Sequence, residues 1–182
     1  GNDLLLGDNA RLMLFQGKVI GLDQDKGDYD EHGCHGFDPY RVGGIQLLSH
    51  EIGGGDILIG GEDNDLMYGQ LGNDTYVFAG KELGNDMVVE AGESNCYGIP
   101  NDPHDRLDFS GFEGPVKVGL STTRQQVINE AWCHGNVNLT LILSSGTGFE
   151  DVIGSEYSDV ILGNIRNNTL QGLGGNDVIY GE

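Results

Sequence analysis

The sequence predicts an all-β chain that winds as a flattened, right-handed coil of parallel strands. Two blocks of the chain carry aspartates that recur every nine residues. Each nine-residue unit begins with glycine and acidic residues and ends with an x-apolar-x triplet. No window of eleven residues keeps the 3.6-residue period of an amphipathic helix. A period of nine leaves room for one turn and one short strand, so we expect one strand per unit.

The two halves of each nine-residue unit, or nonamer, have separate roles. Glycine in the first half permits the positive φ of a tight turn and leaves carbonyl oxygens uncovered. The apolar triplet forms a strand whose middle side chain points inward; we expect this of Leu58, Met67, Tyr76, Ile161, Leu170 and Ile179. The repeated acidic position is occupied by Asp56, Asp65 and Asp74, by Asp159, Asn168 and Asp177, and in partial copies by Asp3 and Asp86.

Two nonamers per circuit of the coil place residues eighteen apart on the same edge. Asp56 then stacks over Asp74, and Asp159 over Asp177. Carboxylates stacked at the strand spacing of about 4.8 Å repel one another. A hard cation bound between successive turns removes this repulsion, and calcium accepts about six to eight carboxylate and carbonyl oxygens with tolerant geometry.

The nonamers resemble the G-G-x-G-x-D-x-U-x pattern of the RTX (hemolysin-type) calcium-binding repeats. The resemblance covers about 51–90 and 150–182, and it implies a parallel β-roll, a right-handed β-solenoid with calcium-binding turns. Asp63 and Tyr157 stand where a fourth-position glycine is expected, and Asn168 replaces an aspartate. We expect those turns to bind calcium more weakly or to be structural. The calcium ligands that the resemblance implies are Asp3, Asp56, Asp63, Asp65, Asp74, Asp86, Asp159, Asn168 and Asp177, with Gly54, Gly60, Gly61, Gly69, Gly72, Gly84, Gly154, Gly163, Gly172 and Gly175.

Composition narrows the classes of partner. The chain has 182 residues, 9 Lys and Arg against 29 Asp and Glu, a formal charge of −20, and 32 glycines. This balance argues against a nucleic-acid binder, which needs a basic face. No run of about 18 apolar residues is present, so we expect no membrane span.

We divide the chain into five segments: 1–10 as the start of the roll, 11–50 as a loop and hairpin insert, 51–90 as the first repeat block, 91–150 as calcium-poor β coils with loop insertions, and 151–182 as the second repeat block. In the middle segment we expect the roll to continue, with a core of Phe109, Phe112, Val118, Leu141 and Phe149. A separate jelly-roll-like subdomain is the alternative. We also expect the chain to continue at both ends into neighbouring domains of a longer protein.

The insert 11–50 departs from the repeats. Leu12-Met13-Leu14-Phe15 and Val19-Ile20 predict a hairpin that turns at Gln16-Gly17. Asp23 to Glu31 superficially resembles a D-x-D-x-D-G calcium loop, but its fifth and sixth positions are swapped and its twelfth is Cys34. Either a solvated acidic loop or an irregular extra calcium site fits this stretch.

The three cysteines are Cys34, Cys96 and Cys133, all in loop-like stretches. One disulfide with a leftover thiol suits an extracellular setting. If each turn flips the chain across the roll, Cys96 and Cys133 fall on opposite edges, which makes Cys34 the preferred partner of either one. Three free thiols are an alternative, and a zinc site built from two Cys-His pairs is disfavoured because adjacent ligands lack the usual spacing.

The sequence contains little that points to catalysis, and we predict no enzyme activity and no catalytic residue. His50-Glu51 has no second histidine at 54, so the metalloprotease helix motif is absent. We predict a secreted, calcium-binding structural or spacer module of a larger protein that folds on calcium outside the cell. The resemblance implies export in the unfolded state. The alternatives are an adhesive or carbohydrate-binding module with Trp132, Tyr97, Tyr40 and Phe37 as contact residues for a glycan or cell-surface partner, and an accessory domain of an extracellular enzyme.

Overall fold

The computed structural model describes residues 4–6, 10–11, 14–15, 18–19, 41–42, 45–47, 55–70, 72–90, 104–130 and 137–182. All regular elements in these ranges are β-strands, and no helix occurs there that is long and apolar enough to cross a membrane. The repeat strands and the strands between them are β7 (Ile57–Ile59), β8 (Leu66–Gln70), β9 (Thr75–Val77), β10 (Gly84–Glu90), β11 (Arg106–Asp108), β12 (Lys117–Gly119), β13 (Gln126–Glu130), β14 (Val137–Leu143), β15 (Asp151–Ile153), β16 (Val160–Leu162), β17 (Thr169–Gln171) and β18 (Val178–Tyr180).

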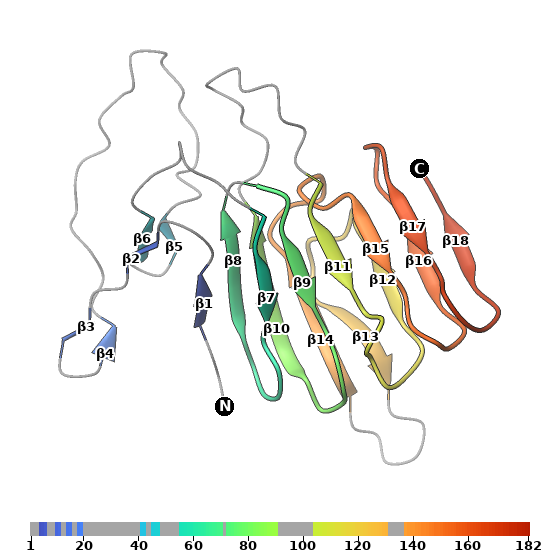
Figure 1. Cartoon of the computed structure of the whole chain (residues 1–182), viewed down its shortest axis with the longest axis horizontal. Coiled ribbons are helices and arrows are strands. Elements are labelled where there is room, and N and C mark those ends of the chain that lie inside the picture. Colours follow the sequence, from blue (N-terminus) through green and yellow to red (C-terminus); the bar gives the residue numbers. More distant parts are fainter. Residues whose placement is uncertain are drawn as a thin grey trace.

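Consecutive strands from β7 to β12, and again from β14 to β18, lie in different sheets. One five-stranded sheet has the order β17-β15-β11-β9-β7, and all its neighbours are parallel. A second has the order β1-β8-β10-β14-β13, where β1 is Leu4–Leu6, and a third is β12-β16-β18. The strands follow one another along the long axis of the molecule (Figure 1). This arrangement confirms the all-β class and the parallel pairing of strands from alternate nonamers.

The stacking of residues eighteen apart is confirmed. Leu58 is in register with Tyr76, and Ile161 with Ile179. The strand centres point inward as expected for Leu58, Met67, Tyr76 and Ile161, which are buried in one core. Leu170 is only half-buried, and Ile179 is 40% exposed, contrary to expectation. The reason is that β18 is the edge strand of its sheet, so it has a neighbour on one side only.

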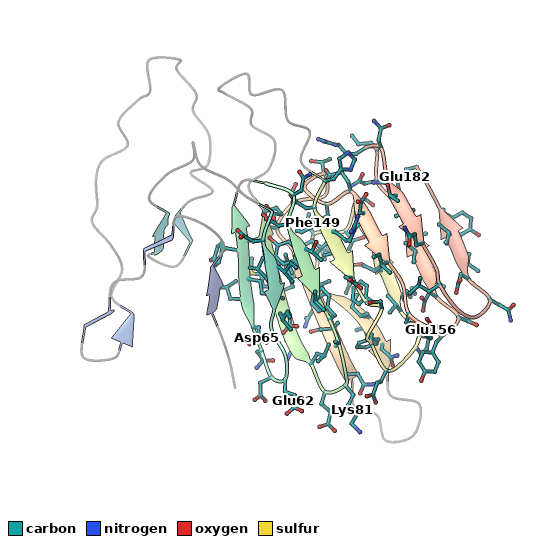
Figure 2. The ribbon with its side chains drawn as sticks, viewed as in Figure 1. Glu62, Asp65, Lys81, Phe149, Glu156 and Glu182 are labelled. Atoms are coloured by element: carbon teal, nitrogen blue, oxygen red, sulfur yellow. The ribbon has the colours of Figure 1, made fainter. Side chains whose placement is uncertain are left out.

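The middle segment shares its sheets and its core with the repeats. β11 lies between β9 and β15, and β12 pairs with β16. The five core residues expected here, Phe109, Phe112, Val118, Leu141 and Phe149, are all buried. Phe109 stacks on Phe78 with ring centroids 4.9 Å apart, and Phe149 meets Tyr76 edge-on at 5.9 Å. Figure 2 shows Phe149 among the strands, whereas Glu62 and Lys81 extend outward from the turns at one edge. These contacts argue against a separate subdomain.

Two features interrupt the parallel order. β13 runs antiparallel to β14, so a hairpin closes one edge of the second sheet. In the insert, the predicted hairpin is confirmed: β3 (Leu14–Phe15) pairs antiparallel with β4 (Lys18–Val19). β6 (Ile45–Leu47) pairs antiparallel with both β2 (Ala10–Arg11) and β5 (Arg41–Val42).

Candidate metal centre

The first glycine of each nonamer lies directly against the sixth-position side chain of the same unit. A Cβ on Gly60 would meet Asp65 Oδ2 at 2.5 Å, and one on Gly172 would meet Asp177 Oδ2 at 2.1 Å. Gly69 with Asp74, Gly154 with Asp159 and Gly163 with Asn168 repeat this geometry, at 2.3, 2.3 and 2.4 Å. Glycine at this position is therefore what lets the acidic side chain turn back over its own loop.

The turns of successive circuits also approach one another closely. A Cβ on Gly84 would lie 1.9 Å from the Asp63 carbonyl oxygen, and one on Gly175 would lie 2.6 Å from that of Tyr157. Gly84 and Gly175 have φ of 86° and 98°, which favours glycine. Asp63 adopts φ 81° without being glycine. Backbone carbonyls and carboxylates thus lie together along the turn edges.

Two columns of carboxylates follow from this stacking. The first column lies just before the strands of the β17-β15-β11-β9-β7 sheet. Each carboxylate in it accepts a hydrogen bond from the backbone N–H of the column residue in the preceding circuit. Asp74 Oδ1 accepts from Asp56 at 2.8 Å, Asp105 Oδ1 from Asp74 at 2.8 Å, and Glu150 Oε2 from Asp105 at 3.0 Å. This column is therefore Asp56, Asp74, Asp105 and Glu150, with Asn168 at the next circuit.

The opposite edge repeats the pattern in two pieces. Asp86 Oδ1 accepts from Asp65 N at 3.0 Å, and Asp177 Oδ1 accepts from Asp159 N at 3.0 Å. Asp159 Oδ1 accepts from Val116 N at 2.7 Å. The predicted stacking is present in both cases: Asp56 over Asp74 in the first column, and Asp159 over Asp177 in the second.

The most concentrated charge lies at Asp74, Glu90 and Asp105. One carboxylate oxygen from each lies within 4.8 Å of the others, and the three side chains are only 1%, 3% and 3% exposed. The Tyr76 hydroxyl donates a hydrogen bond to Glu90. We call these three residues the acidic trio. Three ionised carboxylates at this distance and depth repel strongly unless a cation or protons balance them.

Burial changes the acidity of the column residues. It raises the pKa of Asp105 to about 8, with the neighbouring charges of Asp74 and Glu150 adding to the rise. It raises the pKa of Asp86 and of Glu150 to about 7, although each also accepts a backbone hydrogen bond that lowers the value. The pKa of Tyr76 is well above its ordinary value because the ring is buried beside Glu90.

Sequence reasoning missed Glu90, Asp105 and Glu150. The signal for two of them was present, because Asp105-Arg-Leu-Asp and Glu150-Asp-Val-Ile have the D-x-U-x form of a nonamer's second half. Their turns lack the preceding glycines, and their offsets from the stacked neighbour are 31 and 45 residues instead of eighteen. Glu90, at the end of β10, is in register with Gln70, the second position of a nonamer, where the repeat pattern has glycine.

Several predicted residues lie outside the described ranges. These are the ligands Asp3 and Gly54, the cysteines Cys34, Cys96 and Cys133, the loop 23–31, the neighbouring histidines, and the contact aromatics Phe37, Tyr40, Tyr97 and Trp132.

A family model for the RTX calcium-binding nonapeptide repeat matches this chain in four copies, over residues 53–80 and 145–182. Residues 53–80 and 145–182 are therefore RTX calcium-binding repeats. Both matched segments contain the turn glycines and stacked aspartates described above. No curated protein matches the chain.

RTX repeats bind Ca²⁺, and the donor set of this chain fits that ion. The turn edges offer carboxylate and backbone carbonyl oxygens, which calcium prefers. Glycine keeps the space beside each carboxylate open, as the Cβ distances at Gly60, Gly69 and Gly172 demonstrate. The ligand-by-ligand assignment stays a prediction.

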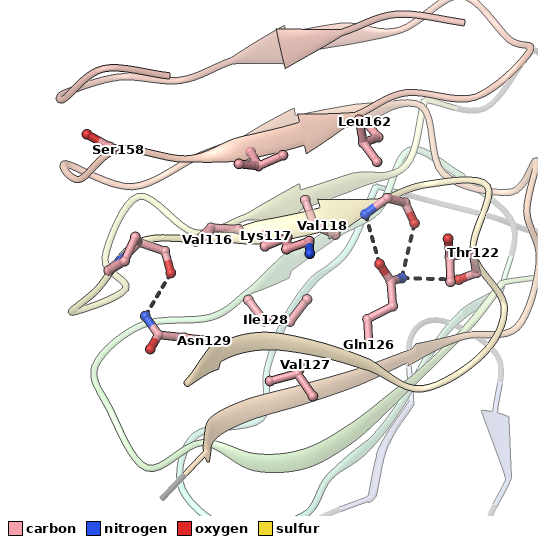
Figure 3. A pocket seen from close by; sticks show the side chains of 13 residues that line it. Val116, Lys117, Val118, Thr122, Gln126, Val127, Ile128, Asn129, Ser158 and Leu162 are labelled. Carbon is pink, nitrogen blue, oxygen red and sulfur yellow. Dashed lines mark hydrogen bonds between the residues drawn. The ribbon is translucent and has the colours of Figure 1, made fainter. Parts of the chain in front are cut away.

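A separate groove of about 690 Å³ lies between β12 and β13 (Figure 3). Its lining contains no carboxylate, and its one charged residue is Lys117. The Gln126 side-chain amide accepts from Gly119 N at 2.8 Å and donates to Gly119 O at 3.0 Å, which closes one end. At the other end, Asn129 Nδ2 donates to Pro115 O at 2.7 Å. The groove is therefore unsuited to a divalent cation.

Proposed function

We propose that this chain is a calcium-dependent β-roll module that folds when calcium binds between its stacked turns. The observation that carries the proposal is the acidic trio, three buried carboxylates with oxygens within 4.8 Å of one another. A divalent cation among them offsets both the desolvation of the charges and their mutual repulsion. In the β-roll we propose ligands at the acidic trio and at Asp56, Asp65, Asp86, Asp159 and Asp177, with turn carbonyls completing each site.

Calcium binding then supplies folding free energy. The unfolded chain carries a formal charge of −20 and 32 glycines, which favour an expanded ensemble. Because the sites are assembled from turns of successive circuits, they do not exist in the unfolded chain, and the free energy of binding stabilises the folded state.

We propose that the module acts outside the cell as a non-catalytic structural spacer. RTX repeat domains are typically found in secreted proteins and are typically non-catalytic. Extracellular calcium modules bind at roughly 10⁻⁴ to 10⁻³ M, so the module would stay loose at intracellular calcium levels and become rigid after export. The blocks 51–90 and 151–182 would form one roll through the calcium-poor segment 91–150, with 1–10 at its start and 11–50 as an insert.

Chelation tests this proposal directly. In excess EDTA the far-ultraviolet circular dichroism should lose β signal, and calcium should restore it. Sodium chloride at matched ionic strength should not restore it, because screening alone does not replace oxygen coordination. An unchanged spectrum in EDTA would mean that packing alone holds the fold.

A matched pair of variants assigns the effect to the trio. Glu90→Gln removes one buried charge, which both weakens calcium binding and relieves repulsion in the calcium-free state. The rise in Tm on adding calcium should therefore be smaller for Glu90→Gln than for the parent chain. Glu113→Gln removes an exposed carboxylate outside the trio and should leave that rise unchanged. Equal rises in both variants would contradict a role for the trio.

A further inference from the structure

One repeat turn replaces the residues that a calcium turn needs. In 163–168 the second, fourth and sixth positions are Asn164, Arg166 and Asn168, where the repeat pattern has glycine, glycine and aspartate. The family resemblance placed Asn168 among the implied calcium ligands, in a turn expected to bind calcium more weakly or to be structural. The contacts of this turn point elsewhere.

The Asn164 side chain occupies the inside of the turn and hydrogen-bonds the backbone carbonyl oxygens there. Its side chain is 1% exposed, and its Nδ2 donates to the carbonyl oxygens of Gly146 at 3.1 Å and Phe149 at 2.8 Å. Its Oδ1 accepts from Arg166 N and from Asn168 Nδ2, both at 3.0 Å. Carbonyl oxygens that face this turn from the preceding circuit are thus already hydrogen-bonded.

Asn168 and Arg166 complete the replacement. Asn168 Oδ1 accepts from Asn164 N at 2.9 Å, and its Nδ2 donates to Glu150 O at 3.0 Å. Arg166 Nε lies 3.5 Å from Glu150 Oε1, and the two side chains are 14% and 1% exposed. Glu150 is the column residue of the preceding circuit, so a guanidinium balances its carboxylate from within the protein.

The turn at 172–177 provides the contrast within the same block. Its sequence is Gly-Leu-Gly-Gly-Asn-Asp, with no cationic side chain. Asp177 Oδ1 accepts a single backbone N–H from Asp159, and Gly172 leaves space beside Oδ2. One nonamer later in the chain, the turn therefore keeps the oxygen-rich character that 163–168 has lost.

We infer that the 163–168 turn takes no calcium and is closed by an internal cation, Arg166, together with the amides of Asn164 and Asn168. The inference rests on the proposed function for the other turns. It predicts that this turn stays ordered when calcium is removed and acts as a calcium-independent anchor for the C-terminal coils. The ion count of the chain is correspondingly lower than the number of its repeats suggests.

A gain-of-site variant tests the inference. The triple substitution Asn164→Gly, Arg166→Gly, Asn168→Asp restores the repeat pattern in the full chain. Bound calcium is counted by equilibrium dialysis and elemental analysis at pH 8, where Glu150 is ionised. We expect one more ion per chain than in the parent, and the control Arg124→Gly, at an exposed residue, should match the parent. An unchanged count in a folded triple variant would overturn the inference.

Hydrogen exchange of the parent chain and of Arg166→Gln keeps the inference testable if the triple variant does not fold. In EDTA the amides of 163–169 in the parent should stay protected while those of 60–75 exchange freely. Arg166→Gln should lose the 163–169 protection in EDTA, with its calcium count unchanged. Loss of protection at 163–169 in the parent chain in EDTA would overturn the inference. Absence of any bound calcium in the parent chain would instead overturn the proposed function.

Discussion

The turns at 69–74 and 163–168 occupy the same place in the nonamer and lead into strands of the same sheet, yet their buried charge is balanced in different ways. At the first, Asp74 lies among Glu90 and Asp105 with carboxylate oxygens within 4.8 Å, and we propose that a calcium ion balances their charge. At the second, Arg166 faces Glu150 at 3.5 Å and two asparagine amides hydrogen-bond the neighbouring carbonyls. On this proposal a turn is closed either by metal or by protein, and only the first kind would make folding depend on calcium.

The two kinds of turn share one hydrophobic core, and the largest expected effect tests that link. Phe109 is fully buried and stacks on Phe78, between the two regions. Phe109→Ala should cost about 3–5 kcal/mol in the free energy of unfolding, because it removes a buried ring and leaves a cavity. Chemical unfolding in saturating calcium measures this cost. Ile57→Ala, at a side chain 72% exposed, is the control and should change little.

If Phe109→Ala destabilised only one of the two turns, the regions would be separate cooperative units. Hydrogen exchange at 60–75 and at 163–169 in the same variant would reveal this. In saturating calcium, where both turns are held, a shared core predicts that protection falls at both sites together.

The next largest effect is expected from a substitution that disrupts only the 69–74 turn. A Cβ on Gly69 would lie 2.3 Å from Asp74 Oδ2 and 2.4 Å from Glu90 Oε1. Gly69→Ala therefore displaces the acidic trio and should cost roughly 1–3 kcal/mol in the presence of calcium. Gly181→Ala, where a Cβ would meet nothing within 4 Å, is the matched control. Equal Tm values for the two variants in calcium would contradict the close packing of the trio.

The last expected effect is a pH dependence of stability that calcium reverses. The pKa of Asp105 is raised from 3.8 to about 8 by burial, so between these values the folded chain holds more protons than the unfolded chain. The contribution of Asp105 to stability is therefore fully present below pH 3.8 and is lost as the pH rises through 8. Without calcium, the free energy of unfolding should fall between pH 5 and pH 8. Asp86 and Glu150, each with a pKa of about 7, act in the same direction.

With calcium the slope should change sign. The ion competes with protons for the same carboxylates, so calcium affinity rises with pH and proton release accompanies binding. Urea unfolding at several pH values, in EDTA and in calcium, measures both slopes. A calcium-free chain that becomes more stable from pH 5 to pH 8 would show that these buried carboxyl groups do not hold their protons.

The sequence predicted those parts of the structure that follow the nine-residue period. The turns, the strand centres Leu58 and Tyr76, and the stacking of Asp56 over Asp74 all depend on an unbroken spacing of eighteen. Asp105 and Glu150 were missed because inserts of unequal length separate them from their stacked neighbours, so spacing alone does not bring them together. Arg166 was missed because its role depends on Glu150, which belongs to another circuit. The prediction that Ile179 points inward was wrong, because its position on an edge strand, and not the periodicity, decides its exposure.

The most direct test of the central claim is a crystal structure grown in calcium, with the ions located by anomalous scattering. We expect calcium within about 2.6 Å of the carboxylate oxygens of Asp74 and its neighbours in the acidic trio, and none in the 163–168 turn. The absence of an ion between the three carboxylates of the acidic trio would contradict the proposed calcium site. An ion coordinated by Asn168 Oδ1 would contradict the calcium-free turn.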